Sequence, residues 1–186
     1  MKCMACKDGY LVASYLEDSF YCHTCESCSG NMVMLSDYMI WHEQHNKTKP
    51  VIDQAREAQA DTVIIDESTS AMICPKSGKL MTKYRISSET EHRLDFCSSS
   101  NVFWMDNGEW DLLKKLGLAG KLKEIFTQYW QREIKSIERT DLLKELYEER
   151  FGDNYERIKS FRKSFNKMPN KSAVMAYLMA DDPYRP

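Results

Sequence analysis

The chain has 186 residues, of which 42% are hydrophobic, so it can bury one ordinary core or two small ones, which excludes a fully disordered or fibrous protein. Its 26 basic and 28 acidic side chains leave a formal net charge of -2, which excludes a histone-like polycation. No apolar run approaches the roughly 18 residues of a membrane span and no secretory pattern follows Met1, so we expect a protein of the reducing cytosol with no membrane partner.

Five of the seven cysteines lie in the first 28 residues, and four of them have the spacing of a metal site. Cys3 and Cys6 make one Cys-x2-Cys knuckle, and Cys25 and Cys28 make a second, with 18 residues between the two knuckles. Two such knuckles joined by a spacer of this length are typical of a tetrahedral four-thiolate zinc site. We therefore predict one Zn2+ per chain on these four thiolates.

The fifth of these cysteines, Cys22, leaves other uses of the region open. The run from Cys22 through Cys25 to Cys28 has the spacing that an iron–sulfur cluster can use, and a redox dithiol is a further alternative. We expect Cys22 itself to be a spare, partly buried thiol on the strand before the second knuckle.

The remainder of the first half is expected to form a hairpin, a helix and a connection. Residues 9–15 and 19–22 alternate as two short strands, so a hairpin joins the two knuckles. Residues 38–45 follow an N-cap signal and should form a helix. Residues 53–60 are expected to be a short helix or a solvated linker, and residues 62–66 a strand.

A shift of about 71 residues brings a second, eroded copy of this pattern into register with the first. Residues 74–77 fall on the first knuckle and residues 97–100 on the second, with a spacer of 19 residues and an expected hairpin over residues 80–96. Ser77 and Ser100 stand where two cysteines would be. Because a neutral hydroxyl is a poor replacement for a thiolate on zinc, we expect no metal in the second copy.

Residues after the second knuckle also recur, and each copy retains what the other has lost. The first copy keeps its four cysteines and Gly30 but has Met32 and Met34 at two positions where the second copy has a tryptophan and an aspartate. The second copy lacks two cysteines but retains Cys74, Pro75, Trp104, Asp106, Gly108 and Glu109.

These motifs resemble the bacterial zinc-finger domains named after the zinc ribbon of the transcription factor TFIIB. The pattern of that family is Cys-Pro-x-Cys, a hairpin, and then Cys-x-x-Cys-x-Gly-x-Trp-x-Asp-x-Gly-Glu before a helix. The resemblance covers about residues 1–40 and 72–116. It implies a zinc-ribbon fold in each copy and a link to transcription, but many members of the family have no established role.

From residue 107 onward the pattern is helical. We expect a helix over residues 109–116 that ends at Gly117, and one long amphipathic helix over residues 122–137. Thr140 or Asp141 should cap the next helix. We interpret the region as a helical bundle that packs on, or is tethered to, the two ribbon-like copies.

The last two helices are expected to begin at capping signals. Asp153 with Glu156 forms a capping-box pattern for a helix that carries Phe161 and Phe165. A proline and an asparagine end that helix, and residues 173–180 should form the last one.

The sequence therefore predicts an α+β protein in four segments. Residues 1–46 form an N-terminal four-cysteine zinc ribbon, and residues 47–71 a linker with a short helix or strand. Residues 72–117 form a degenerate zinc-ribbon-like hairpin repeat, and residues 118–186 a mostly α-helical C-terminal region.

Positive charge gathers late in the chain. Residues 107–186 hold 16 basic and 13 acidic side chains, and no acid lies between the six cations Arg157, Lys159, Arg162, Lys163, Lys167 and Lys171. Interleaved with Phe161 and Phe165, these cations could follow a nucleic-acid backbone. The alternative is a solvated helix face whose two phenylalanines point into the bundle.

Other polar pairs give no catalytic site. His42 and His45 are three positions apart, whereas the metalloprotease motif needs histidines four apart, so we expect surface side chains. Asp106 is best explained as a cap or turn residue and Glu109 as a first-turn acid. We expect no catalytic residues.

We therefore expect a non-catalytic adaptor or regulator that uses a structural zinc site and binds a protein partner through its helical region. The first alternative is a DNA- or RNA-binding, transcription-related protein that uses the basic segment 157–171. The second is a redox sensor in which Cys22 attacks the zinc cluster. The sequence leaves the oligomeric state open.

Overall fold

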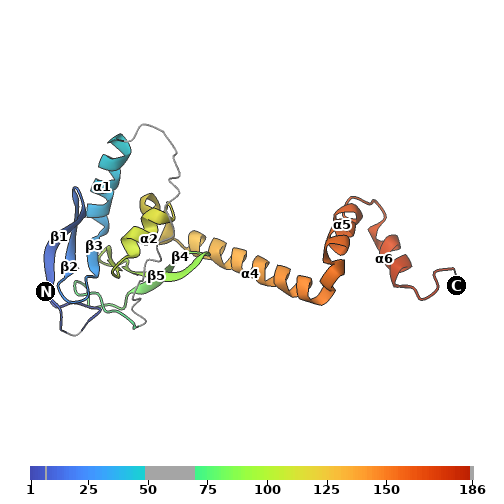
Figure 1. Ribbon diagram of the computed structural model, residues 1–186, viewed down its shortest axis with the longest axis horizontal. Coiled ribbons are helices and arrows are strands. Elements are labelled where there is room, and N and C mark those ends of the chain that lie inside the picture. Colours follow the sequence, from blue (N-terminus) through green and yellow to red (C-terminus); the bar gives the residue numbers. More distant parts are fainter. Residues whose placement is uncertain (7, 49–69, 185–186) are drawn as a thin grey trace. The chain divides into compact units, whose positions relative to one another are not determined.

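The computed structural model describes residues 1–6, 8–48 and 70–184 (Figure 1). The segments expected at residues 53–60 and 62–66 therefore lie outside the described residues. The chain divides into two compact units, unit 1 over residues 1–137 and unit 2 over residues 138–186. One helix, α4 (Gln128–Phe151), begins in unit 1 and ends in unit 2.

Unit 1 is built on a six-stranded antiparallel sheet with the strand order β1-β2-β3-β6-β5-β4. Its strands are β1 (Leu11–Glu17), β2 (Phe20–Cys25), β3 (Asn31–Met34), β4 (Thr82–Ser87), β5 (Thr90–Cys97) and β6 (Val102–Met105). The two expected hairpins are present as β1–β2 and β4–β5. The short strands β3 and β6 were not expected from the sequence, because four residues buried on both faces show no alternation.

The two halves of the sheet meet at β3 and β6 around a local twofold axis. Met32 pairs with Trp104, and these are the equivalent residues of the two copies, 72 positions apart. Before each of these strands the chain turns through a residue with positive φ, Ser29 at 56° and Asn101 at 52°. The internal repeat found in the sequence is therefore also a structural repeat, and its two halves share one sheet.

Helices pack on one face of this sheet. They are α1 (Leu35–Thr48), α2 (Glu109–Lys115), the 3-10 turn η1 (Ala119–Lys121), α3 (Leu122–Ile125) and the start of α4. The core between helices and sheet joins strand residues such as Phe20 and Phe103 to Tyr38, Trp41 and Trp110. The opposite face carries a second apolar cluster, which includes Met32, Trp104 and the cysteines of both copies.

The single helix expected over residues 122–137 is wrong, because the chain breaks at Phe126 and Thr127. The hydroxyl of Thr127 accepts a hydrogen bond from the backbone N–H of Trp130 at 3.2 Å, which caps the N-terminus of α4. The cap expected at Thr140 or Asp141 is also wrong, since both residues lie inside the uninterrupted α4. A threonine caps only where the backbone leaves its N–H groups unpaired, and that condition is met at Thr127.

Unit 2 contains the end of α4, the turn η2 (Gly152–Asn154), α5 (Tyr155–Phe165) and α6 (Lys171–Met179). The capping box expected from Asp153 and Glu156 does not form, because Asn154 occupies the N-cap position and makes no side-chain cap bond. None of the described residues from 138 to 184 is buried. The expected helical bundle is therefore not found in unit 2, whose helices enclose no core.

The four segments expected from the sequence are arranged differently in the structure. Residues 1–46 and 72–117 share one sheet, and the beginning of the helical region, up to residue 137, belongs to the same unit. Trp130 fastens that region to the sheet by donating to the carbonyl of Ile86 at 3.0 Å. Within the described parts of the chain, no helix combines the length and apolarity needed to cross a membrane.

Candidate metal centre

The four cysteines predicted as ligands come together at the end of the β1–β2 hairpin. The sulfur atoms of Cys3, Cys6, Cys25 and Cys28 all lie within 4.8 Å of one another. Cys3 Sγ is 3.8 Å from Cys28 Sγ, and Cys6 Sγ is 3.5 Å from Cys25 Sγ. Sulfurs around a tetrahedral metal with metal–sulfur bonds of about 2.3 Å lie about 3.8 Å apart, so the cluster has the dimensions of a metal site.

Backbone N–H groups of the two knuckles point at the sulfurs. Ala5 and Cys6 donate to Cys3 Sγ at 3.3 and 3.5 Å, and Ser27 donates to Cys25 Sγ at 3.4 Å. Burial alone would raise the pKa of the Cys25 thiol, but hydrogen bonds from the backbone of Cys28 and Ser27 outweigh it and lower that pKa to about 7. The pKa values of Cys3 and Cys28 are raised, chiefly by burial. A cation would remove this penalty, because metal binding keeps the thiols ionised.

Gly9 makes room for the cluster. A Cβ atom at Gly9 would lie 2.3 Å from Cys25 Sγ and 2.7 Å from Cys6 Sγ, closer than atoms approach in proteins. The carbonyl of Gly9 also accepts a hydrogen bond from the backbone N–H of Cys3 at 2.8 Å. Gly9 was expected at the start of a strand, and its contact with Cys6 and Cys25 was not predicted from the sequence.

Cys22 lies outside the sulfur cluster. It belongs to the core on the helix-covered face and is 1% exposed, so it is more deeply buried than the sequence suggested. Cys25, three positions later on the same strand, belongs to the cluster on the opposite face. Burial raises the pKa of Cys22. The arrangement therefore separates Cys22 from the four sulfurs that it would have to attack as a redox sensor.

The second copy has the same arrangement of four side chains, with cysteine–serine contacts in place of the two sulfur–sulfur pairs. Cys74 Sγ lies 3.0 Å from Ser100 Oγ, and Ser77 Oγ lies 3.2 Å from Cys97 Sγ. These are the equivalents of the Cys3–Cys28 and Cys6–Cys25 pairs in the first copy. In each cysteine–serine pair the thiol and the hydroxyl are within hydrogen-bonding distance of each other.

Lys79 occupies the position of Gly9 in the second copy. The carbonyl of Lys79 accepts a hydrogen bond from Cys74 N at 2.9 Å, as that of Gly9 does from Cys3. Burial alone would raise the pKa of Cys97, but hydrogen bonds with Ser100, Ser77 and Ser99 outweigh it and lower that pKa to about 6. The second copy therefore differs from the first at the position of Gly9 as well as at the two positions where serine replaces cysteine.

The glycine kept in one copy and the tryptophan kept in the other contact each other across the local twofold axis. Gly30 of the first copy lies under the indole of Trp104, and a Cβ there would overlap the ring. At the equivalent positions the second copy has Val102 in place of the glycine, and the first copy has Met32 in place of the tryptophan. Both residues lie in the same apolar cluster. A glycine is thus needed in only one copy, because only the other copy has the tryptophan.

Asp106 and Glu109 form a buried structural network. Asp106 Oδ1 accepts a hydrogen bond from Trp104 Nε1 at 2.6 Å, and Glu109 Oε2 accepts one from the backbone N–H of Asp106 at 2.8 Å. The two carboxyl groups hold the tryptophan and the start of α2 in place. This agrees with the expected turn and first-turn roles.

The remaining candidates lie away from the sulfur cluster. His42 and His45 are half-buried and stack on Tyr38 and Trp41, with ring centroids 5.6 and 4.6 Å apart, so they are less exposed than expected. Four of the six expected nucleic-acid contacts lie on α5, Lys167 follows it, and Lys171 begins α6. They are Arg157, Lys159, Arg162, Lys163, Lys167 and Lys171.

Comparison of the chain with protein-family models, with curated proteins and with solved structures finds no match. The class that fold and site define is therefore a mixed α/β protein with a four-cysteine cluster of metal-binding dimensions.

Proposed function

We propose that this protein is a non-catalytic, zinc-binding adaptor or regulator that binds another protein chain through unit 2. The observation that carries the proposal is that unit 2 exposes large apolar side chains and buries none of its described residues. The proposal has two further parts: a structural zinc ion bound by the four N-terminal cysteines, and a second copy of the same fold that binds no metal.

The choice of zinc rests on the ligands and their geometry. Four thiolates at tetrahedral spacing suit Zn2+ and fill its coordination shell, which leaves no open position for a substrate or a water. Such a site stabilises a fold and does not catalyse. An iron–sulfur cluster is the weaker choice, since Cys22 lies in the other core and does not extend the ligand run.

The proposed fold family is that of the TFIIB-type zinc ribbon. In each half, a hairpin follows the first knuckle, the second knuckle follows the hairpin, and a short strand then leads towards a helix. In the second copy Trp104 lies in β6, Asp106 in the turn that follows and Glu109 at the start of α2, and the family motif has these residue types before its helix. This order of elements supports a double ribbon whose halves share one sheet.

The proposed protein interface is the apolar surface of unit 2. Leu142, Tyr147, Ile158 and Phe161 are between 41% and 66% exposed in helices that pack around no core of their own. Short helices with exposed apolar faces are marginally stable in water, and tertiary contacts must supply the missing stability. A protein partner that covers these side chains would supply them.

Nucleic-acid binding is the second candidate. Phe161 and Phe165 stack on each other with centroids 6.0 Å apart, and Phe161 is 46% exposed, so the two rings are not inserted in a bundle. Exposed aromatic rings among cations are a surface on which bases can stack. Against this reading, Lys159 is held by Glu156 at 2.8 Å, and the chain as a whole is slightly acidic.

A salt titration separates these two candidates. Labelled single- and double-stranded DNA and RNA are titrated with zinc-loaded protein, and with a variant in which Lys159, Arg162, Lys163 and Lys167 are neutralised. The adaptor proposal predicts no binding by either protein at physiological salt. Binding that falls steeply with salt and disappears in the variant would favour the nucleic-acid candidate instead.

The protein interface itself is tested by partner capture from cell extract. Replacing Tyr147 and Ile158 by serine should abolish capture of the bound protein, because both side chains line the exposed apolar surface. Tyr129→Ser is the matched control, since Tyr129 is 72% exposed on the same helix but lies in unit 1. Equal capture by all three proteins would contradict the proposed interface.

A further inference from the structure

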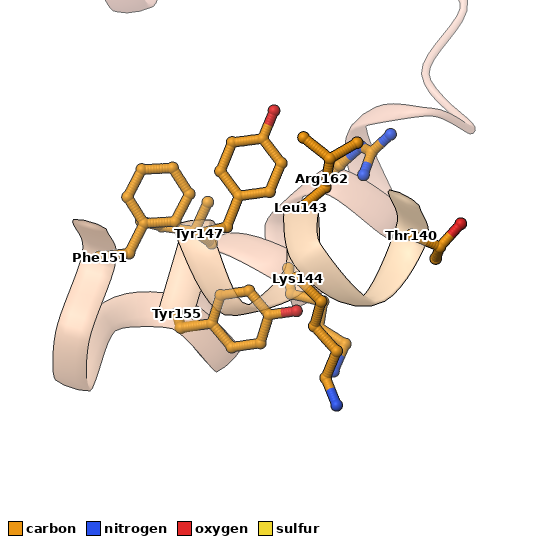
Figure 2. Close-up of a pocket in the computed structure, with 9 residues that line it drawn as sticks. Thr140, Leu143, Lys144, Tyr147, Phe151, Tyr155 and Arg162 are labelled. Atoms are coloured by element: carbon orange, nitrogen blue, oxygen red, sulfur yellow. The ribbon is translucent and has the colours of Figure 1, made fainter. Parts of the chain in front are cut away.

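Unit 2 contains a groove between the end of α4 and α5. It has a volume of about 720 Å3, and Figure 2 shows the side chains that line it. Tyr147, Phe151 and Tyr155 form an aromatic end, with Tyr147 and Phe151 stacked at 5.5 Å. Arg162 and Thr140 lie at the opposite end (Figure 2).

The groove has a cationic rim around an apolar floor. Lys144, Lys159 and Arg162 line it, together with Leu143 and Ile158. Lys144 and Lys159 have acidic neighbours on their own helices, Glu148 at 3.8 Å and Glu156 at 2.8 Å. Among the described residues, Arg162 has no carboxylate partner. An occupant of matching chemistry is therefore an apolar segment that ends in acidic groups.

A segment of this chemistry lies in unit 2 itself. Helix α6 is the apolar stretch Lys171–Met179, whose residues Met175, Tyr177, Leu178 and Met179 are between 44% and 78% exposed. Asp181 and Asp182 follow directly, and no other acid lies between residues 157 and 184. The carbonyl end of the helix adds partial negative charge at the same place.

The connection between α5 and α6 argues against insertion of α6 into the groove of its own chain. Only residues 166–170 join the two helices, so an α6 that folded back would run antiparallel to α5. Asp181 and Asp182 would then reach the end near Tyr155, where Lys159 is already paired with Glu156, and Lys171 would reach Arg162. A helix from a second copy is free of this restriction and can bring its acidic end to Arg162 and Lys144.

The geometry points to a homodimer in which α6 of each copy lies in the α4–α5 groove of the other copy. This inference rests on the proposed function of unit 2 as a protein-binding segment and names the partner as a second copy of this chain. Each copy places its α6 in the groove of the other. The two contacts are therefore identical and related by a single twofold axis, and both grooves are filled. This arrangement covers Leu143, Tyr147 and Ile158, which line the groove and are exposed in a single chain.

The test is the mass of the full-length, zinc-loaded protein in solution, measured by light scattering over a concentration series. We expect a particle of twice 21.8 kDa that dissociates on dilution. Two charge-reversal variants probe the contact: Lys144→Glu with Arg162→Glu reverses the groove, and Asp181→Lys with Asp182→Lys reverses the helix end. Each variant alone should dimerise about tenfold or more weakly, because both contacts in its dimer become repulsive.

The decisive experiment mixes the groove variant with the helix-end variant and measures whether they form a heterodimer. In the mixed dimer, each groove faces an α6 of opposite charge, so a 1:1 heterodimer should form with near wild-type affinity. Lys163→Glu with Lys167→Glu is the matched control, since neither residue lines the groove, and it should remain dimeric. All these side chains lie in unit 2, away from the four cysteines of unit 1, so the zinc content should not change.

Three outcomes would overturn the inference. A wild-type protein that is monomeric at every concentration contradicts a homodimer. Equal dimerisation of wild type and both charge variants places the dimer contact elsewhere. A mixture that does not form a heterodimer excludes the proposed pairing. If the wild type is monomeric but still captures another protein in a manner that depends on Tyr147 and Ile158, the proposed function stands and the homodimer fails; if it does neither, both fail.

Discussion

At the scale of single residues, three differences separate the four-cysteine cluster from the equivalent site of the second copy. Ser77 and Ser100 replace two thiols, and Lys79 replaces Gly9. In both copies the first cysteine donates to the carbonyl at the end of the loop that follows it, Cys3 to Gly9 and Cys74 to Lys79, but the loop is one residue shorter in the second copy. The two sites therefore differ in their side chains and in the length of the loop beside them.

Replacing Cys25 by serine should remove the single metal ion and unfold the N-terminal ribbon, because binding energy in a structural site is folding energy. Cys97→Ser changes the equivalent residue of the second copy and should leave the metal content at one per chain. Elemental analysis of the purified proteins measures both. Two metal ions per wild-type chain, or one ion retained by Cys25→Ser, would refute the assignment of the ligands.

Gly9→Ala should weaken metal binding by about 1–3 kcal/mol, the usual cost of forcing a methyl group into a packed site. The added Cβ overlaps Cys25 Sγ and Cys6 Sγ, so the knuckles must move apart. Competition with a chromophoric chelator measures the change in affinity. The control is Lys79→Ala, which alters the equivalent position of the second copy; a matching loss of affinity there would show that the effect is not specific to the cluster.

Metal affinity should fall as the pH falls. Because the pKa values of Cys3 and Cys28 are raised, both thiols are protonated in the metal-free protein near neutral pH and must lose their protons on binding. Two displaced protons give a loss of at least about 100-fold in apparent affinity per pH unit. Below about pH 7, where Cys25 is also protonated, the slope should become steeper. A pH-independent affinity between pH 6 and 8 would contradict thiolate ligation.

At the scale of elements, the central pair β3 and β6 decides how the two copies fit together. Trp104 is 1% exposed and reaches across the axis onto Gly30, and its indole N–H is fixed by Asp106. A buried indole needs both an apolar contact and an acceptor for its N–H, and the two copies supply one each. The complementary losses of glycine and tryptophan follow from this single contact.

A double-mutant cycle tests this packing. Gly30→Ala should destabilise the metal-loaded protein by about 1–3 kcal/mol, because the new methyl group overlaps the indole of Trp104. In a Trp104→Met background, where the ring is absent, the same substitution should cost far less, giving a coupling energy of about 1 kcal/mol or more. Urea unfolding followed by fluorescence measures all four proteins. Additive effects would mean that the two residues do not share a contact.

At the scale of the whole molecule, the two units differ in what holds them together. Unit 1 has cores on both faces of its sheet, with Phe103 and Val102 both fully buried. Unit 2 has helices but no buried residue among those described. If another chain covers its helices, as proposed above, their stability should depend on protein concentration.

Limited proteolysis should show this difference. At low protein concentration, protease should cleave first within residues 138–184 and leave a fragment near residues 1–137 that still holds its metal ion. Raising the concentration should slow cleavage, because association covers the exposed side chains. Mass spectrometry of the fragments, with their metal content, measures both effects. First cleavage within the strands of unit 1 would contradict this order of stability.

Signals between residues close together in the sequence were sufficient to predict several features of the structure. The spacing of Cys3, Cys6, Cys25 and Cys28 predicted the cluster, because two knuckles and a hairpin are built from contacts close along the chain. Alternation predicted both hairpins, and Gly117, with φ at 67°, marked the end of α2 as expected. The repeat was visible because whole motifs recur in the same order.

The sequence by itself thus determined the four-cysteine cluster, the two hairpins and the internal repeat, all of which depend on short-range spacing. Only the tertiary structure decided that β3 pairs with β6, that Cys22 belongs to the opposite core, that Thr127 and not Thr140 caps α4, and that unit 2 encloses no core. These features depend on which surfaces meet across long distances in the chain. Residue patterns show that a face is apolar, but the packing of the folded chain decides what covers it.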